Sequence, residues 1–105
     1  MSNPWRGEVT LVIDGQACVM RLTLGALAGL EDALAEPSLI ALVERFEQSR
    51  FSSGDVLALL KAGLRGGNCP VAPDALDHAE IEGGPMAAAR AAAELIARAF
   101  VVPGA

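Results

Sequence analysis

The chain has 105 residues, of which 52% are apolar, and its formal net charge is −5. This length suits one domain, residues 1–105, with one packed core. The eight Lys and Arg residues are scattered, which argues against binding to nucleic acid or to an anionic membrane surface. No apolar run approaches the ~20 residues of a membrane-spanning helix, and residues 1–7 show no signal peptide. We therefore expect a cytoplasmic protein.

The first predicted element is a β-hairpin over about residues 7–22. Two β-prone runs flank Asp14-Gly15, and this dipeptide favours a type I′ turn because both central residues need positive φ. The two-residue loop sets the register of the strands, which gives the hairpin one strongly apolar face. The residues of this predicted core face are Val9, Leu11, Ile13, Cys18, Met20 and Leu22.

The opposite face of the hairpin is half apolar. It carries Thr10, Val12 and Val19, and the register places Glu8 opposite Arg21 as a cross-strand ion pair. A lone hairpin is only marginally stable, so the hairpin must pack on other elements. The second face then either binds a partner protein or is covered by the last helix of the chain itself.

Four or five helices follow the hairpin, so the predicted fold class is α+β. Their expected ranges are about 23–35, 37–48, 53–65, 73–81 and 85–100. Thr23 is a suitable N-cap for the first helix. Ser52 with Asp55 three residues later resembles a capping box for the third. Gly25 and Gly29 weaken the first helix or mark a place of close packing.

No pattern of side chains points to catalysis, a cofactor or a metal. The single histidine, His78, lies in an acidic stretch, and we interpret it as solvated; a small enzyme that uses His78 is the remote alternative. One histidine excludes a His-based metal triad. The acidic residues nearby are Asp74, Asp77, Glu80 and Glu82, which lack the ligand pattern of a calcium loop. We interpret them as a solvated face and predict that the protein is not an enzyme.

The two cysteines, Cys18 and Cys69, lie far apart in the sequence. They form neither a CxxC motif nor a Cys/His ligand set. We interpret them as reduced thiols, with Cys18 buried in a strand. A disulfide or a metal site is the alternative.

A longer pattern of turn, apolar and polar residues runs from Arg6 to Gly67. It consists of RGEV at 6–9, IDG at 13–15, LTLGALAGLE at 22–31, FSSGDV at 51–56 and AGLRGG at 62–67. This pattern resembles small tail-cluster proteins of gene transfer agents and related phages, which are grouped with the phage tail assembly chaperones. The resemblance implies that the chain helps to build a phage-like tail encoded by a gene transfer agent or prophage. It also implies no catalytic residues, because the family has no catalytic signature.

The resemblance implies a tail assembly chaperone that holds the tape measure protein until tube subunits polymerise around it. The expected partner surface is the second hairpin face with the first helix. Its residues are Thr10, Val12, Val19, Glu8, Arg21, Leu27 and Glu31. A free hairpin edge also permits a homo-oligomer, either a dimer or a ring. The alternative is a minor structural component of the tail. We favour the chaperone over a tube subunit because one hairpin supplies less β-structure than a tube wall normally contains.

Overall fold

The computed structural model of this protein describes residues 7–34, 39–67 and 71–99. Its elements are β1 (Val9–Ile13), β2 (Gln16–Met20), α1 (Leu24–Leu34), α2 (Leu39–Glu47), α3 (Ser53–Gly66), the 3₁₀-helix η2 (Pro73–His78) and α4 (Gly84–Ala99). An antiparallel hairpin followed by five helices in this part of the chain confirms the predicted α+β class. No helix of the described residues is long and apolar enough to cross a membrane. That residues 1–105 form a single domain stays a prediction.

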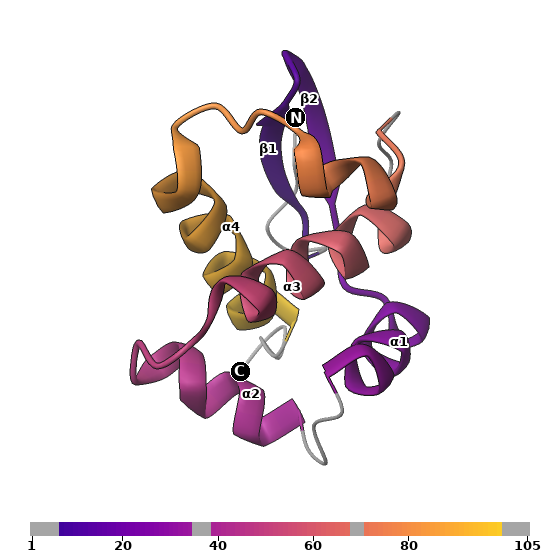
Figure 1. The fold of residues 1–105 in the computed structure, drawn as a ribbon. Helices are drawn as coiled ribbons and strands as arrows, with labels where there is room; N and C mark the ends of the chain where they lie inside the picture. Colours follow the sequence, from indigo (N-terminus) through magenta and orange to yellow (C-terminus); the bar gives the residue numbers. More distant parts are fainter. Residues whose placement is uncertain (1–6, 35–38, 68–70, 100–105) are drawn as a thin grey trace.

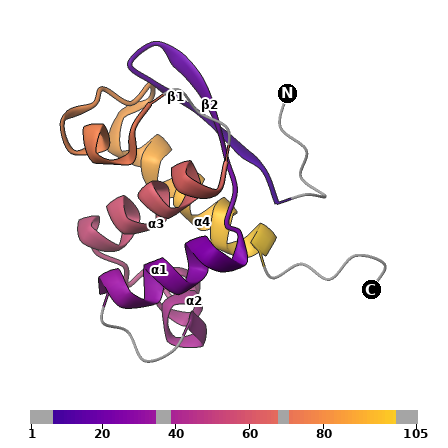
Figure 2. The ribbon, with the colours of Figure 1, turned by 90° about the vertical axis from the view of Figure 1, so that its right-hand side faces the viewer.

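Helix α3 occupies the middle of the fold. It contacts β2, α1, η2 and α4, and α1 and α4 lie on opposite sides of it (Figure 1). The hairpin projects at one end of the molecule and α2 lies at the other, which the turned view shows as well (Figure 2). The expected helix boundaries at residues 35, 37 and 100 lie outside the described residues.

The turn of the hairpin has the predicted geometry. Asp14 and Gly15 have φ values of 51° and 78°, as a type I′ turn requires. The turn is also bound to the segment that follows η2. The backbone N–H of Asp14 donates to the carbonyl oxygen of Glu80 at 2.8 Å, and the Glu80 N–H donates to Asp14 Oδ1 at 2.8 Å. This reciprocal pair holds the hairpin tip against the chain near residue 80.

The predicted core face of the hairpin is buried. The register pairs Val9 with Met20 and Ile13 with Gln16, as the two-residue loop requires. All six predicted core-face residues belong to the hydrophobic core, which is completed mainly by α3 and α4. The most deeply buried helical side chains of this core include Leu59, Leu60, Ala92 and Leu95. Burial of this face explains why the hairpin is stable although it has only two strands.

Both predicted helix caps are present. Thr23 Oγ1 accepts a hydrogen bond from the Ala26 N–H at 3.1 Å. Ser52 Oγ accepts from the Asp55 N–H at 3.1 Å, and Asp55 Oδ2 accepts from the Ser52 N–H at 2.9 Å, which completes the capping box. The second oxygen of the buried Asp55 accepts from Arg45 Nη2 at 2.9 Å. The capping residue of α3 therefore also connects α3 to α2.

The chain after η2 is extended rather than helical. We expected a helix over 73–81, but η2 ends at His78. Residues 80–82 instead bond to β1: Ile81 forms an antiparallel bridge with Ile13, and the Glu82 N–H donates to the Val12 carbonyl at 3.1 Å. These bonds satisfy part of the edge of β1, which local sequence preference does not anticipate.

The state of Cys18 differs from the prediction. Its side chain is fully buried, as expected, but it is disulfide-bonded, so the interpretation as a reduced thiol is wrong. Cys69, the other cysteine of the sequence, lies outside the described residues. Spacing along the chain carries no information on the distance between two sulfur atoms in space, which is why the sequence misled here.

Two glycine substitutions test the close packing of α3. A Cβ at Gly63 would lie 2.9 Å from Leu95 Cδ1 and 3.0 Å from Met20 Cβ. We expect Gly63→Ala to lower the free energy of unfolding by about 1–3 kcal/mol because the core is overfilled. Gly25→Ala in α1 meets no atom within 4 Å and should raise it by up to about 1 kcal/mol through helix propensity. Urea unfolding followed by circular dichroism measures both, and effects of the same sign would contradict the packing.

Alkylation tests the bonding of Cys18. In denatured protein, iodoacetamide should label Cys18 only after treatment with a reducing agent, because a disulfide sulfur does not react with it. Mass spectrometry of the tryptic peptide Gly7–Arg21 gives the readout. Full labelling without the reducing agent would show that Cys18 is a free thiol.

Candidate interaction surfaces

The first candidate surface is the outer face of the hairpin, formed by Thr10, Val12, Ala17 and Val19. Thr10 and Ala17 are exposed, and Val12 and Val19 are half-buried. Helix α4 packs beside β1 but leaves these residues accessible. Of the two readings left open by the sequence, the structure therefore rules out complete cover of this face by the last helix.

The predicted ion pair of Glu8 with Arg21 is absent from the ion pairs of the described residues. The paired strands end at Val9 and Met20, one residue before the two charges would meet. The carbonyl oxygen of Glu8 accepts a hydrogen bond from Arg98 Nη1 at 2.6 Å instead. This long-range contact attaches the start of β1 to the last turn of α4.

The predicted partner surface also includes two residues of α1, Leu27 and Glu31. Leu27 packs against the core, and Glu31 is half-buried. Leu24 is 85% exposed, although helical periodicity groups it with Leu27. The positions of Gly25 and Gly29 have no atom within 4 Å of an added Cβ. The close packing that these glycines allow is thus not used within the described part of the chain.

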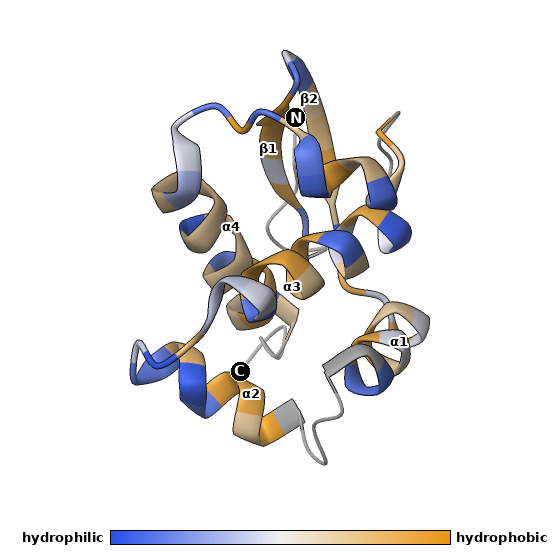
Figure 3. Cartoon of the chain, in the orientation of Figure 1, coloured by the Kyte–Doolittle hydropathy of each residue, from blue (hydrophilic) through white to orange (hydrophobic). Residues whose placement is uncertain are grey.

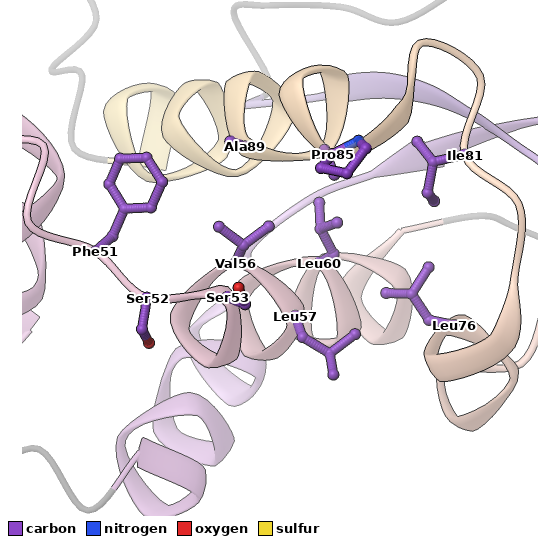
Figure 4. A pocket seen from close by; sticks show the side chains of 11 residues that line it. Phe51, Ser52, Ser53, Val56, Leu57, Leu60, Leu76, Ile81, Pro85 and Ala89 are labelled. Carbon is purple, nitrogen blue, oxygen red and sulfur yellow. The ribbon is translucent and has the colours of Figure 1, made fainter.

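A second candidate surface, which sequence reasoning missed, is an apolar groove of about 420 Å³ between α3, η2 and α4. Figure 4 shows Val56 and Leu60 of α3 pointing toward α4, with Leu76 of η2 and Ile81 at one end. We call it the α3–α4 groove. Its lining consists of Phe51, Ser52, Ser53, Val56, Leu57, Leu60, Leu76, Ile81, Pro85, Ala88 and Ala89.

The α3–α4 groove exists because one of its walls is made of small side chains. The alanine-rich sequence of α4 reads simply as high helix propensity, yet Ala88 and Ala89 also leave space opposite α3. Phe51 limits the other end and stacks on Phe46 with ring centroids 4.6 Å apart. No ionisable side chain lines the groove, so it suits apolar contact and not acid–base chemistry.

The polar residues considered for catalysis or metal binding do not form a site. His78 is exposed at the end of η2. Asp77 Oδ1 forms an ion pair with Lys61 Nζ at 2.8 Å. No group of three or more His, Cys, Asp or Glu side chains within the described ranges is placed to hold a metal ion. Figure 3 shows hydrophilic residues at the hairpin tip and more apolar ones along α3.

The sequence from residue 6 to residue 101 matches the family described as "Phage tail tube protein, GTA-gp10". The chain belongs to this family. The match includes every helix and strand of the described residues. No curated protein and no solved structure matches the chain significantly.

Membership of this tail tube family confirms the expected link to the tail of a phage or gene transfer agent. The family is structural, which confirms the prediction that the chain is not an enzyme. The prediction of a tail assembly chaperone is wrong: a tube protein is a structural component, as the alternative reading had it. That prediction rested on the resemblance, and a tube subunit was disfavoured because one chain contains little β-structure. Sheets that form between copies are not visible in one copy.

A dye-binding experiment tests whether the α3–α4 groove is accessible. Ala89→Leu fills the groove, so we expect it to lower the fluorescence of bound anilinonaphthalene sulfonate, a dye that binds exposed apolar sites. Ala28→Leu adds the same side chain at an exposed position of α1 and serves as the control. Equal fluorescence of the wild type and the Ala89→Leu variant would contradict an open groove.

Proposed function

We propose that this chain is a structural subunit of the tail tube of a phage-like particle. The observation that carries the proposal is the family match over residues 6–101, which covers the hairpin and every helix of the described residues. A tube repeats one subunit many times, so its subunit must offer surfaces for contact with copies of itself. The proposal therefore includes homo-oligomer formation.

The accessible apolar surface supports this function. The outer face of the hairpin and the α3–α4 groove are both open. Exposed apolar area of this kind commonly marks protein interfaces. These two surfaces are formed by different elements of one subunit, which suits the several neighbours that a tube subunit has.

Within this proposal, Thr10, Val12 and Val19 are assembly contacts. Their outer face is accessible and apolar in part, which favours packing of a second sheet or helix on it. The tape measure protein is then a partner only inside the finished tube, where the tube wall surrounds it.

Analysis of purified particles tests the proposed function directly. Quantitative mass spectrometry should find this chain in many copies per particle, and antibody labelling should decorate the tail along its length. Recovery of the chain from the cell lysate but not from particles would overturn the proposal.

A substitution on the outer face tests the assembly contact. Val19→Glu places a charge on a half-buried position, and we expect it to reduce incorporation into particles at least several-fold because an interface would have to desolvate the carboxylate. Ile40→Lys is the control, since Ile40 is already 67% exposed on the distant α2. Circular dichroism establishes that both variants fold. Normal incorporation of the Val19→Glu variant would remove the outer face from the interface.

A further inference from the structure

The hairpin tip carries negative charge that no cation of the described residues neutralises. The bonds between Asp14 and Glu80 and between Glu82 and β1 gather three acidic residues at this end of the molecule. All three are exposed, and none belongs to an ion pair within the described ranges. Figures 1 and 2 show that the tip projects from the body of the fold. It is therefore a narrow, accessible and acidic protrusion.

A smaller groove between α1 and α3 carries the opposite charge. It has a volume of about 230 Å³ and is lined by Leu30, Gly54, Leu57, Ala58, Lys61 and Arg65. We call it the α1–α3 groove. Asp77 neutralises Lys61, but Arg65 is exposed and takes part in no ion pair of the described residues. The acidic residues of α1, Glu31 and Asp32, do not line this groove.

A second unpaired guanidinium lies at the same end of the molecule. The backbone N–H of Arg21 donates to the Gly63 carbonyl at 3.0 Å, so the end of β2 lies against the last turn of α3, which carries Arg65. Five-residue strands are about 17 Å long. The acidic tip and the pair Arg21 and Arg65 are thus separated by the length of the hairpin and cannot neutralise each other within one chain.

We propose that the hairpin tip of one copy docks in the α1–α3 groove of a second copy. Charge complementarity selects this occupant: two tips repel, two grooves repel, and only tip against groove brings Glu80 and Glu82 near Arg65. The contact joins two different surfaces, so it is heterologous and links copies head to tail. This inference rests on the proposed function, because it names the surfaces through which tube subunits would meet.

The test uses the purified full chain and measures self-association by sedimentation velocity at low and high salt. Because salt screens charges, we expect the chain to associate at about 0.05 M NaCl and to associate more weakly at about 0.5 M NaCl. Arg65→Glu and Glu82→Lys, each alone, should weaken association about tenfold, because each places like charges in contact. The double variant restores an opposite-charge pair between positions 65 and 82, so it should associate more strongly than either single variant.

Mixing the two single variants separates a heterologous contact from other arrangements. The lysine of the Glu82→Lys chain meets the glutamate of the Arg65→Glu chain, and the reverse pair keeps its native charges. An equimolar mixture should therefore associate more strongly than either variant does alone. Growth in mass beyond a dimer with increasing concentration is expected for a head-to-tail contact, and a limit at the dimer would overturn it.

Matched controls place the same charge changes elsewhere. Arg90→Glu on α4 and Glu44→Lys on α2 alter exposed residues outside the tip and the α1–α3 groove, and their association should equal that of the wild type. If a single variant proves unstable in circular dichroism, Arg65→Gln and Glu80→Lys replace it. Association weakened equally by the controls, or a wild type that stays monomeric at low salt, would overturn the inference.

The inference and the proposed function fail in different ways. If the Arg65→Glu variant enters particles as efficiently as the wild type, the docking contact is refuted while the structural role stands. If the wild-type chain is missing from particles, the structural role itself fails, whatever the salt dependence of association in solution.

Discussion

The close contact of α3 with the hairpin and α4 is the constraint on which the other features depend. At Gly63 the helix approaches Met20 and Leu95 so closely that no larger side chain fits without displacement. This approach seals the core face of the hairpin, which would otherwise be an unstable two-stranded element. It also brings the Gly63 carbonyl within reach of the Arg21 N–H, so the backbone of β2 is bound where the strand ends.

The central position of α3 generates both grooves. On one side, the small alanines of α4 face Val56 and Leu60 and leave an apolar groove. On the other side, α1 faces Lys61 and Arg65, and the space between them is lined partly by charge. One helix therefore presents an uncharged surface and a cationic surface on neighbouring faces, and Leu57 lines both grooves. A subunit that contacts several copies of itself needs such surfaces of different chemistry, because identical surfaces permit only closed, two-fold contacts.

Assignment to the tail tube family changes how the small β-content is understood. The described residues contain one hairpin, and residues 80–82 and the α3 terminus occupy parts of its two edges. The outer face and the tip of the hairpin remain accessible, whereas its core face is buried. We disfavoured a tube subunit by comparing the β-content of one chain with that of a complete tube wall. The structure of a single copy does not support that comparison.

The sequence by itself determined the features that depend on neighbouring residues. The Asp14-Gly15 turn, the strand register, the Thr23 cap and the capping box at Ser52 were all predictable because short-range hydrogen bonds and positive φ decide them. Tertiary structure decided the features that join distant residues. These are the pairing of residues 80–82 with β1, the hydrogen bond from Arg98 to the Glu8 carbonyl, the disulfide of Cys18 and the two grooves. These features depend on which elements pack against each other across the core, and local residue type and spacing do not determine that packing.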